Sequence, residues 1–340
     1  MHQPNRRKAA LVCEGGGLKA AYVCGAINQL IEDGGFDFDL LIGASSSAPS
    51  LAYLCCGIES FRSNLSIWTD ELFHGAFPRG LLDLRTYFRL RNVLDYDKLM
   101  DLLVYRRPIG YREIMNSPAA LVIPVSDVET GIPAYYSTKK LRIQESYPHL
   151  EIRVLGTEEE GCFWEVLRAS ITVPIPFVSK PVQLDKGRYF CDGGILAPVP
   201  IYPALAAGDR QLVVIVTKPE NYQRRNYISN NFEGFRWIIS QRTSILRGQY
   251  QKVFEKWNQN DQECREQIES LRKKDRAIVI RPAKKIPLTL YTSSLSGVEC
   301  LIEQGRQDAM KALLDYRKRT GEAENGELSR RDRVLQCRAN

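Results

Sequence analysis

Short apolar runs of strand length alternate with helically spaced segments along the first part of the chain. The run 9–13 ends at Glu14 and three glycines, and apolar positions in 20–31 then recur every three to four residues. A second apolar run, 39–43, leads through a serine-rich turn into an apolar segment at 48–56. The order strand, glycine turn, helix, strand, turn, helix is typical of the beginning of a parallel α/β sheet.

The rest of the chain predicts further strands and helices, and its composition changes near residue 217. The expected elements are strands at 119–125 and 132–136, a helix at 162–170, strands at 188–191, 211–217 and 277–280, and a helix at 300–317. Residues 221–274 are polar, basic and helical in pattern. We therefore expect an α/β fold built on a parallel sheet. An α/β domain is expected at 9–217, with a mainly helical, basic region at 218–340 packed on it and a flexible tail from about 320.

The composition is that of an ordinary globular protein. The 340 residues are 44% hydrophobic and 26% charged, which excludes disordered, collagen-like and coiled-coil chains. Lysines and arginines outnumber acidic residues 47 to 40, but the excess is spread along the chain, so it indicates an anionic surface only weakly and gives no reason to expect nucleic acid. The nine cysteines lack C-x-x-C spacing and the polar N-terminus is not typical of a secretory signal. We expect a cytoplasmic protein with reduced cysteines.

The turn after the second apolar run is a candidate nucleophile elbow. In Gly43-Ala-Ser45-Ser-Ser47 a serine stands between an apolar strand and a helix, as in the motif G-x-S-x-G, with Ser47 in place of the last glycine. Such a turn exposes the Ser45 hydroxyl at the carboxyl edge of the sheet. The alternative is that one of these serines only caps the helix that follows.

A carboxylate is a better candidate than a histidine for the base that would activate Ser45. The chain has three histidines, which are His2, His74 and His149. His149 lies in a polar segment without a strand end or a glycine turn, His2 lies in the N-terminal tail, and His74 lies in a stretch that we expect to be mobile. Asp192 follows a strand and precedes Gly193-Gly194, so a second strand end would bring a carboxylate to the same edge of the sheet. Taken alone, Asp192-Gly193 is also typical of a tight turn in which the aspartate bonds its own backbone.

The glycine loop before the first helix supplies a third element. Its residues are Gly15, Gly16, Gly17, Leu18 and Lys19. Glycines between a strand and a helix leave backbone N–H groups at a helix N-terminus, which is what an oxyanion hole for acyl transfer requires. Lys19 adds positive potential or anchors the loop.

The same loop admits a rival interpretation as a dinucleotide site. Residues 15–20 formally match G-x-G-x-x-G/A, and Asp37 and Asp39 follow about 20 residues later. Against this interpretation, the second strand ends at Gly43, so neither aspartate would meet a ribose at its carboxyl end.

Together, the glycine loop, the G-x-S turn and the Asp-Gly-Gly turn resemble the patatin-like phospholipases. The resemblance covers about 9–217 and includes two further stretches, 169–174 and 192–200. It implies a patatin-like, three-layer α/β/α fold with a mainly parallel central sheet, and a Ser-Asp dyad instead of a triad, which needs no cofactor. No metal is expected, since the sequence has no H-E-x-x-H motif and no Cys/His cluster. By position, Ser45 matches the nucleophile and Asp192 the general base.

The resemblance also implies roles for the surrounding residues. The oxyanion loop is matched by Gly15, Gly16, Gly17 and Leu18, and the supporting motif positions by Lys19, Gly43, Ser47, Gly193 and Gly194. The implied activity is hydrolysis of carboxylic ester bonds of lipids, of phospholipase A, lysophospholipase or esterase type, with peripheral attachment to an anionic membrane as one setting. Ala20 and Ser47 replace two family glycines, and an inactive domain acting as a membrane or partner adaptor therefore stays open beside the dinucleotide-binding oxidoreductase.

Two further segments admit both a functional and an ordinary interpretation. The basic, aromatic stretch 61–112 is either a lid over an acyl pocket or a solvated helical face. The stretch 227–274 is either an interfacial helix on anionic lipid or a surface helix packed on the core. Neither segment indicates an oligomeric state.

Overall fold

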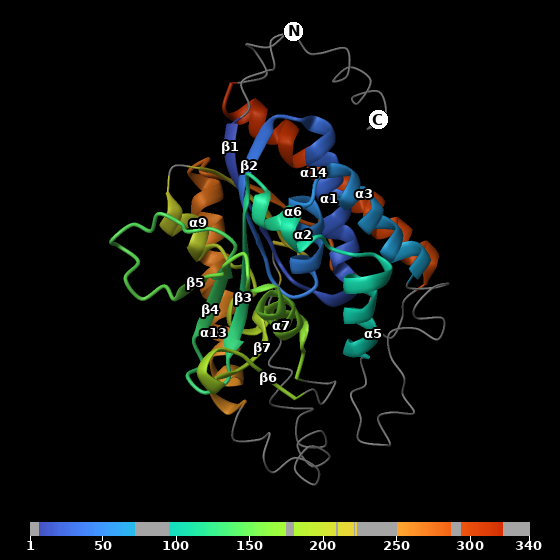
Figure 1. Ribbon diagram of the computed structural model, residues 1–340. Coiled ribbons are helices and arrows are strands. Elements are labelled where there is room, and N and C mark those ends of the chain that lie inside the picture. The colour runs from blue at the N-terminus through green and yellow to red at the C-terminus, as the bar shows by residue number, and fades with distance from the viewer. Residues whose placement is uncertain are drawn as a thin grey trace, which may run out of the picture.

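The computed structural model describes residues 7–71, 95–174, 180–208, 210–220, 222, 250–286 and 294–321. These residues form a three-layer α/β/α structure around one mixed, mainly parallel sheet (Figure 1). The strands described are β1 (Arg7–Cys13), β2 (Phe36–Gly43), β3 (Ala120–Asp127), β4 (Pro133–Ser137), β5 (Ile152–Val154), β6 (Val182–Gln183), β7 (Tyr189–Asp192), β8 (Gln211–Ile215) and β9 (Ala277–Ile280). Their main order is β5-β4-β3-β2-β1-β8-β9, and the predicted fold class is confirmed.

The first strand shows why the apolar runs are continuous rather than alternating. Leu11 and Cys13 of β1 belong to one hydrophobic cluster, and Ala10 and Val12 belong to another on the opposite face. Parallel strands covered by helices on both faces bury every side chain, so they lack a polar face. The pairs β1–β2, β1–β8, β2–β3 and β8–β9 are all parallel.

Helices cover the two faces of the sheet. On one face lie α1 (Ala20–Asp33), α2 (Ser47–Cys55), α3 (Ile58–Ser66) and α14 (Leu295–Arg319), and on the other lie α9 (Tyr202–Ala207) and α13 (Gln251–Lys273) (Figure 1). The helices α1 and α14 approach closely at glycines. A Cβ atom added to Gly25 would lie 1.9 Å from the carbonyl oxygen of Ile302, and one added to Gly305 would lie 2.0 Å from that of Tyr22.

The chain beyond residue 217 completes the same sheet. Strand β9 pairs with β8, and α13 and α14 cover opposite faces. The predicted strand 277–280 matches β9. Helix α14 begins at Leu295, five residues before the predicted start, because the Ser294 hydroxyl caps it by accepting the Gly297 N–H at 3.1 Å. The division of the chain at residue 217 stays a prediction.

The stretch 61–112 is described only in part. It continues α3 into a π-helical turn (Ile67–Glu71), and resumes with α5 (Tyr96–Asp101), a second π-helical turn (Leu102–Arg106) and α6 (Tyr111–Asn116). Three predicted segments lie wholly or partly outside the described residues. They are the middle of the predicted lid (72–94), the part of the predicted interfacial helix that precedes α13 (227–249), and the tail after 321. Within the described ranges, no helix is both long enough and apolar enough to cross a bilayer.

Strands β2 and β7 meet end to end along the same edge of β3. Strand β2 runs parallel to β3 and pairs as far as Val122, whereas β7 runs antiparallel and pairs from Val125, opposite Asp192. The carboxyl ends of β2 and β7 therefore face each other across a gap at 123–124. This corrects the sequence argument, which placed Ser45 and Asp192 together through parallel strands sharing one carboxyl edge.

Candidate active site

Ser45 occupies a strained turn between β2 and α2. Its φ is 54°, a left-handed conformation that residues other than glycine rarely adopt. The preceding Gly43 has no room for a side chain, because a Cβ atom would lie 2.8 Å from Leu51 Cδ1 and 3.0 Å from the Ser47 carbonyl carbon. The turn therefore has the backbone expected of a nucleophile elbow. The alternative of a simple cap is not observed, since the structure shows no side-chain cap on α2.

Asp192 lies within hydrogen-bond distance of Ser45. The Ser45 hydroxyl donates to Asp192 Oδ2 at 2.6 Å, and the Gly194 N–H donates to Asp192 Oδ1 at 2.7 Å. Ser45 is 7% exposed and Asp192 is 4% exposed, so the pair is screened from bulk water. Gly193 fits because a Cβ atom there would lie 2.1 Å from the Pro124 carbonyl oxygen. Asp192 is the N-cap of α8 (Gly193–Leu196), a single helical turn, and that turn holds one carboxylate oxygen while leaving the other to Ser45.

Burial makes the Asp192 carboxylate a stronger base than an ordinary aspartate. Desolvation raises the pKa of Asp192 from 3.8 to about 7, and the hydrogen bonds from Ser45 and Gly194 oppose this rise. A carboxylate with a pKa near neutrality can take a proton from a hydroxyl and return it later.

The glycine loop lies against Ser45. A Cβ atom on Gly15 would lie 2.6 Å from Ser45 Cβ, so only a glycine allows this approach. Gly17 has a φ of 61° and opens a short 3₁₀ turn, Gly17–Lys19, that continues into α1. Among the described residues, the N–H groups of Gly16 and Gly17 donate no hydrogen bond. They are therefore available at the positive end of a helix.

Leu18 and Lys19 differ in their surroundings. The Leu18 side chain is buried in the core, which anchors the loop. Lys19 is partly buried, and burial followed by the nearby Lys218 ammonium lowers its pKa.

Both departures from the family motifs have a local explanation. Ala20 is buried at the start of α1 with a right-handed φ of −63°, a conformation that needs no glycine. Ser47 is fully buried, and its hydroxyl donates to the Glu14 carbonyl oxygen at 2.8 Å. The serine thus ties the elbow to the residue that precedes the glycine loop.

Several residues that support the site were not singled out from the sequence. The Ser126 hydroxyl donates to the Asp192 carbonyl oxygen at 2.8 Å and accepts the Leu196 N–H at 3.1 Å. The Thr172 carbonyl oxygen accepts the Asp192 N–H at 2.9 Å. A serine at a buried position of the apolar strand β3 was the available signal for Ser126, since buried hydroxyls need partners.

The rival chemistries are not supported by the geometry. His149 is exposed in the turn before β5, and His2 and His74 lie outside the described residues. Asp37 and Asp39 lie at the start of β2, at the opposite end of the sheet from the glycine loop, and Asp39 forms an ion pair with Arg210 at 2.7 Å. In the described part of the chain, no three His, Cys, Asp or Glu side chains gather as metal ligands would, and every cysteine is a free thiol.

Comparisons with known proteins show what the chain is similar to. The family model "Patatin-like phospholipase" matches residues 11–205. The uncharacterized protein YjjU of Escherichia coli K12 is 28% identical over 218 residues, which are 64% of this chain and 53% of YjjU. The chain therefore spans about half the length of this curated relative.

Two solved structures show distant likeness. VipD from Legionella pneumophila has a TM-score of 0.48 at 14% identity, covering 92% of this chain and 67% of VipD. The type III effector ExoU, of Pseudomonas aeruginosa, has a TM-score of 0.36 at 11% identity, covering 92% of this chain and 53% of ExoU. Both are too distant to carry an argument of their own. The family assignment rests on the match over 11–205, which includes the elbow, the glycine loop and the Asp-Gly-Gly turn: the chain belongs to the patatin-like phospholipase family.

Proposed function

We propose that the chain is a serine lipid acyl hydrolase that cleaves carboxylic ester bonds through Ser45 and Asp192. Membership of the patatin-like phospholipase family supports lipid esters as the substrate class. The observation that carries the proposal is the 2.6 Å hydrogen bond from the Ser45 hydroxyl to a buried carboxylate whose pKa is raised to about 7. The catalytic domain is proposed to lie within 9–217.

The first half of the reaction acylates Ser45. As Ser45 Oγ forms a bond to the ester carbonyl carbon, its proton passes to Asp192 Oδ2, and the carbonyl π electrons move to the oxygen. The tetrahedral intermediate then expels the alcohol oxygen, which takes the proton from Asp192. The acyl group remains on Ser45 as an ester.

The second half uses water and repeats these steps. Asp192 takes a proton from a water molecule that attacks the acyl carbon, and it returns that proton to Ser45 Oγ when the fatty acid leaves. The reaction consumes one water and needs no cofactor.

The glycine loop stabilises the negative charge that forms in both halves. The N–H groups of Gly16 and Gly17 donate no hydrogen bond within the described part of the chain and lie at the positive end of the helix that starts at Gly17. Fixed donors of this kind typically contribute about 10²–10³ to kcat each. Gly15 and Leu18 hold the loop against Ser45 and the core.

Labelling with a fluorophosphonate serine probe tests the proposal. Ser45→Ala should abolish labelling and Asp192→Asn should lower its rate sharply, while Ser46→Ala is the matched control, because it removes the neighbouring hydroxyl and should leave labelling unchanged. Wild-type labelling in Ser45→Ala would refute the mechanism. No labelling of folded wild-type protein would instead favour the adaptor, and binding to anionic vesicles would then be measured.

A further inference from the structure

A buried carboxylate lies directly behind the glycine loop. Glu14 follows β1, and its side chain is only 2% exposed. One of its oxygens, Oε2, accepts the Thr217 N–H at 2.6 Å and the Thr217 hydroxyl at 3.1 Å. The other, Oε1, receives Lys218 Nζ at 2.8 Å and Arg265 Nη2 at 3.0 Å.

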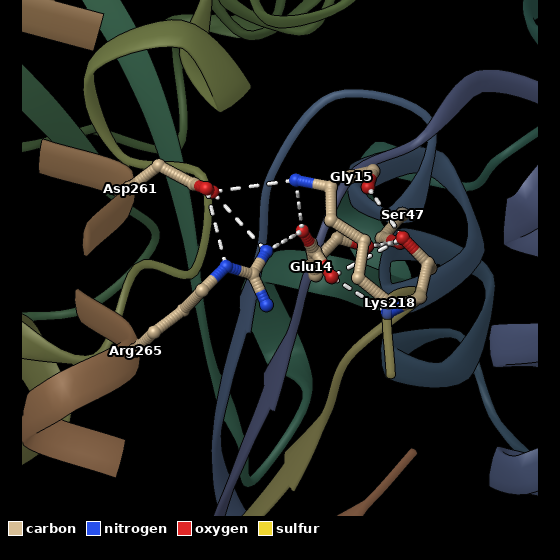
Figure 2. A network of polar contacts seen from close by, with 7 residues as sticks. Glu14, Gly15, Ser47, Lys218, Asp261 and Arg265 are labelled. Atoms are coloured by element: carbon tan, nitrogen blue, oxygen red, sulfur yellow. Dashed lines mark hydrogen bonds and ion pairs between the residues drawn. The ribbon is translucent and has the colours of Figure 1, made fainter. Parts of the chain in front are cut away.

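Helix α13 supplies one of these cations and closes the network. Arg265 and Asp261, one turn apart, form an ion pair at 3.1 Å, and Lys218 Nζ lies 3.3 Å from the same Asp261 carboxylate. Figure 2 shows Lys218 and Arg265 lying between the carboxylates of Glu14 and Asp261. Two cations and two anions therefore meet in one network, in which both carboxylates are almost fully buried.

The main chain of Glu14 is held as firmly as its side chain. Its N–H donates to the Ile215 carbonyl oxygen at 2.9 Å, and its carbonyl oxygen accepts the Ser47 hydroxyl at 2.8 Å. Glu14 thus joins three parts of the protein, which are the elbow, the end of β8 and α13. The next residue is Gly15, the first residue of the loop.

The same helix also contacts the turn that carries Asp192. The Asn260 side-chain amide donates to the Leu196 carbonyl oxygen at 2.7 Å. Around the N-terminal half of α13, Tyr250 and Val253 share a buried cluster with Ile195, which follows the Asp192-Gly193-Gly194 turn. Adjacent residues of one helix, Asn260 and Asp261, therefore face the two separate halves of the site.

We propose that α13 is a brace that fixes the glycine loop relative to the Asp192 turn, with Arg265 as a positioning residue that acts through Glu14. The inference rests on the function proposed above and extends it to a helix that lies outside the matched range 11–205. Arg265 does not reach the reacting atoms. It holds the carboxylate next to the loop whose N–H groups would bind the oxyanion.

The contact between Arg265 and Glu14 affects the position of the loop because Glu14 is charged. Burial alone would raise the pKa of Glu14, but Lys218, Arg265 and the Thr217 N–H outweigh burial and lower it, so the carboxylate stays charged. A buried ion pair of this kind contributes little to stability compared with well-packed apolar residues, whereas removing one partner leaves an unpaired buried charge. Without Arg265, Glu14 must therefore shift toward its remaining donors, and the glycine loop shifts with it.

The test measures the fluorophosphonate labelling rate constant per active site, after titrating the fraction of sites that label at completion. The variants are Arg265→Gln, Arg265→Lys and Asp261→Asn. The matched control is Arg272→Gln, because Arg272 is also an arginine of α13 with two glutamate partners, Glu220 and Glu269, and among the described residues it contacts neither the glycine loop nor the Asp192 turn. Unfolding of part of a sample changes the titrated fraction and leaves the rate constant per site unchanged.

We expect the rate constant of Arg265→Gln to fall about ten- to a hundredfold, since small misplacements of this kind are costly in catalysis. Arg265→Lys should recover part of the loss, and Arg272→Gln should label like the wild type. If Arg265→Gln does not fold, Arg265→Lys and Asp261→Asn test the inference instead, after circular dichroism has shown that each is folded. Their labelling rate constants should fall by a smaller factor. A wild-type rate constant in the folded variants would overturn the inference, as would an equal loss in Arg272→Gln. Failure of the proposed function is distinct, because the wild type itself would then not label through Ser45.

Discussion

Replacing Asp192 with asparagine should change the pH dependence of stability. The folded protein raises the pKa of this carboxyl from 3.8 to about 7, because the group is buried. The folded state therefore binds a proton that the unfolded state has already released between these pH values. Stability falls as pH rises through that window and levels off above pH 7, at about 1.36 kcal/mol per pH unit within it.

The size of the effect follows from the same rise. Between pH 5 and pH 8, the free energy of unfolding changes only up to about pH 7, which is a span of about two pH units. The wild type should therefore lose about 3 kcal/mol of unfolding free energy through Asp192. Asp192→Asn cannot ionise, so its unfolding free energy minus that of the wild type should grow by about 3 kcal/mol between the two pH values. The hydrogen bond from Ser45 is stronger when the carboxylate is ionised, and the pKa of about 7 already contains this part of the effect.

Urea unfolding at pH 5 and pH 8 measures this difference. Asp97→Asn is the matched control, because the Asp97 side chain is 82% exposed and pairs only at the surface with Arg168. Its difference from the wild type should stay nearly constant with pH. If Asp192→Asn behaved like Asp97→Asn, the carboxylate would not be the strong, buried base on which the mechanism depends.

Three further predictions concern the site and the packing of the helices. Ester hydrolysis, measured as kcat/KM against pH, should rise with a midpoint near 7 as the Asp192 carboxyl ionises, and a profile that is flat from pH 5 to pH 9 would contradict its role as base. Ser47→Gly should lower the unfolding free energy by about 1–2 kcal/mol, because it removes a buried hydrogen bond and leaves the Glu14 carbonyl oxygen without this donor, and a variant at least as stable as the wild type would count against that account. Gly25→Ala should lower the melting temperature, at a cost of about 1–3 kcal/mol, because its Cβ would collide with the Ile302 carbonyl oxygen. Gly161→Ala, which meets nothing within 4 Å, is its control, and equal melting temperatures for the two variants would refute the packing argument.

The elements of the fold were largely predictable because their signals are local. Apolar runs bounded by glycine identify β1 and β2 within a few residues, and the short apolar run between Arg276 and Arg281 identifies β9. The direction of β7 was not predictable, since a short apolar run reads the same in either orientation. Strand β5 was missed because it spans only Ile152–Val154 and two of its three residues are partly exposed.

Some residues of the candidate site were predictable from local motifs, and others were not. Ser45, Asp192 and the glycine loop stand in short motifs, and the structure brings them together. The partners of Glu14 follow 204 and 251 residues later, as Lys218 and Arg265, in polar segments that resemble any solvated surface. Nothing local marks a charge that tertiary packing will bury.

Because β2 and β7 meet end to end along β3, strand β3 sets the distance between the strand ends that carry Ser45 and Asp192. Val122 is the last β3 residue to pair with β2, and Val125 pairs with Asp192, so the separation of the two strand ends is set by three residue steps of one extended strand, roughly 10 Å. An extended strand in the middle of a sheet neither lengthens nor shortens when ligands or surfaces bind. The separation of the strand ends that carry Ser45 and Asp192 is therefore insensitive to such events, whereas the position of the glycine loop depends on the partners of Glu14.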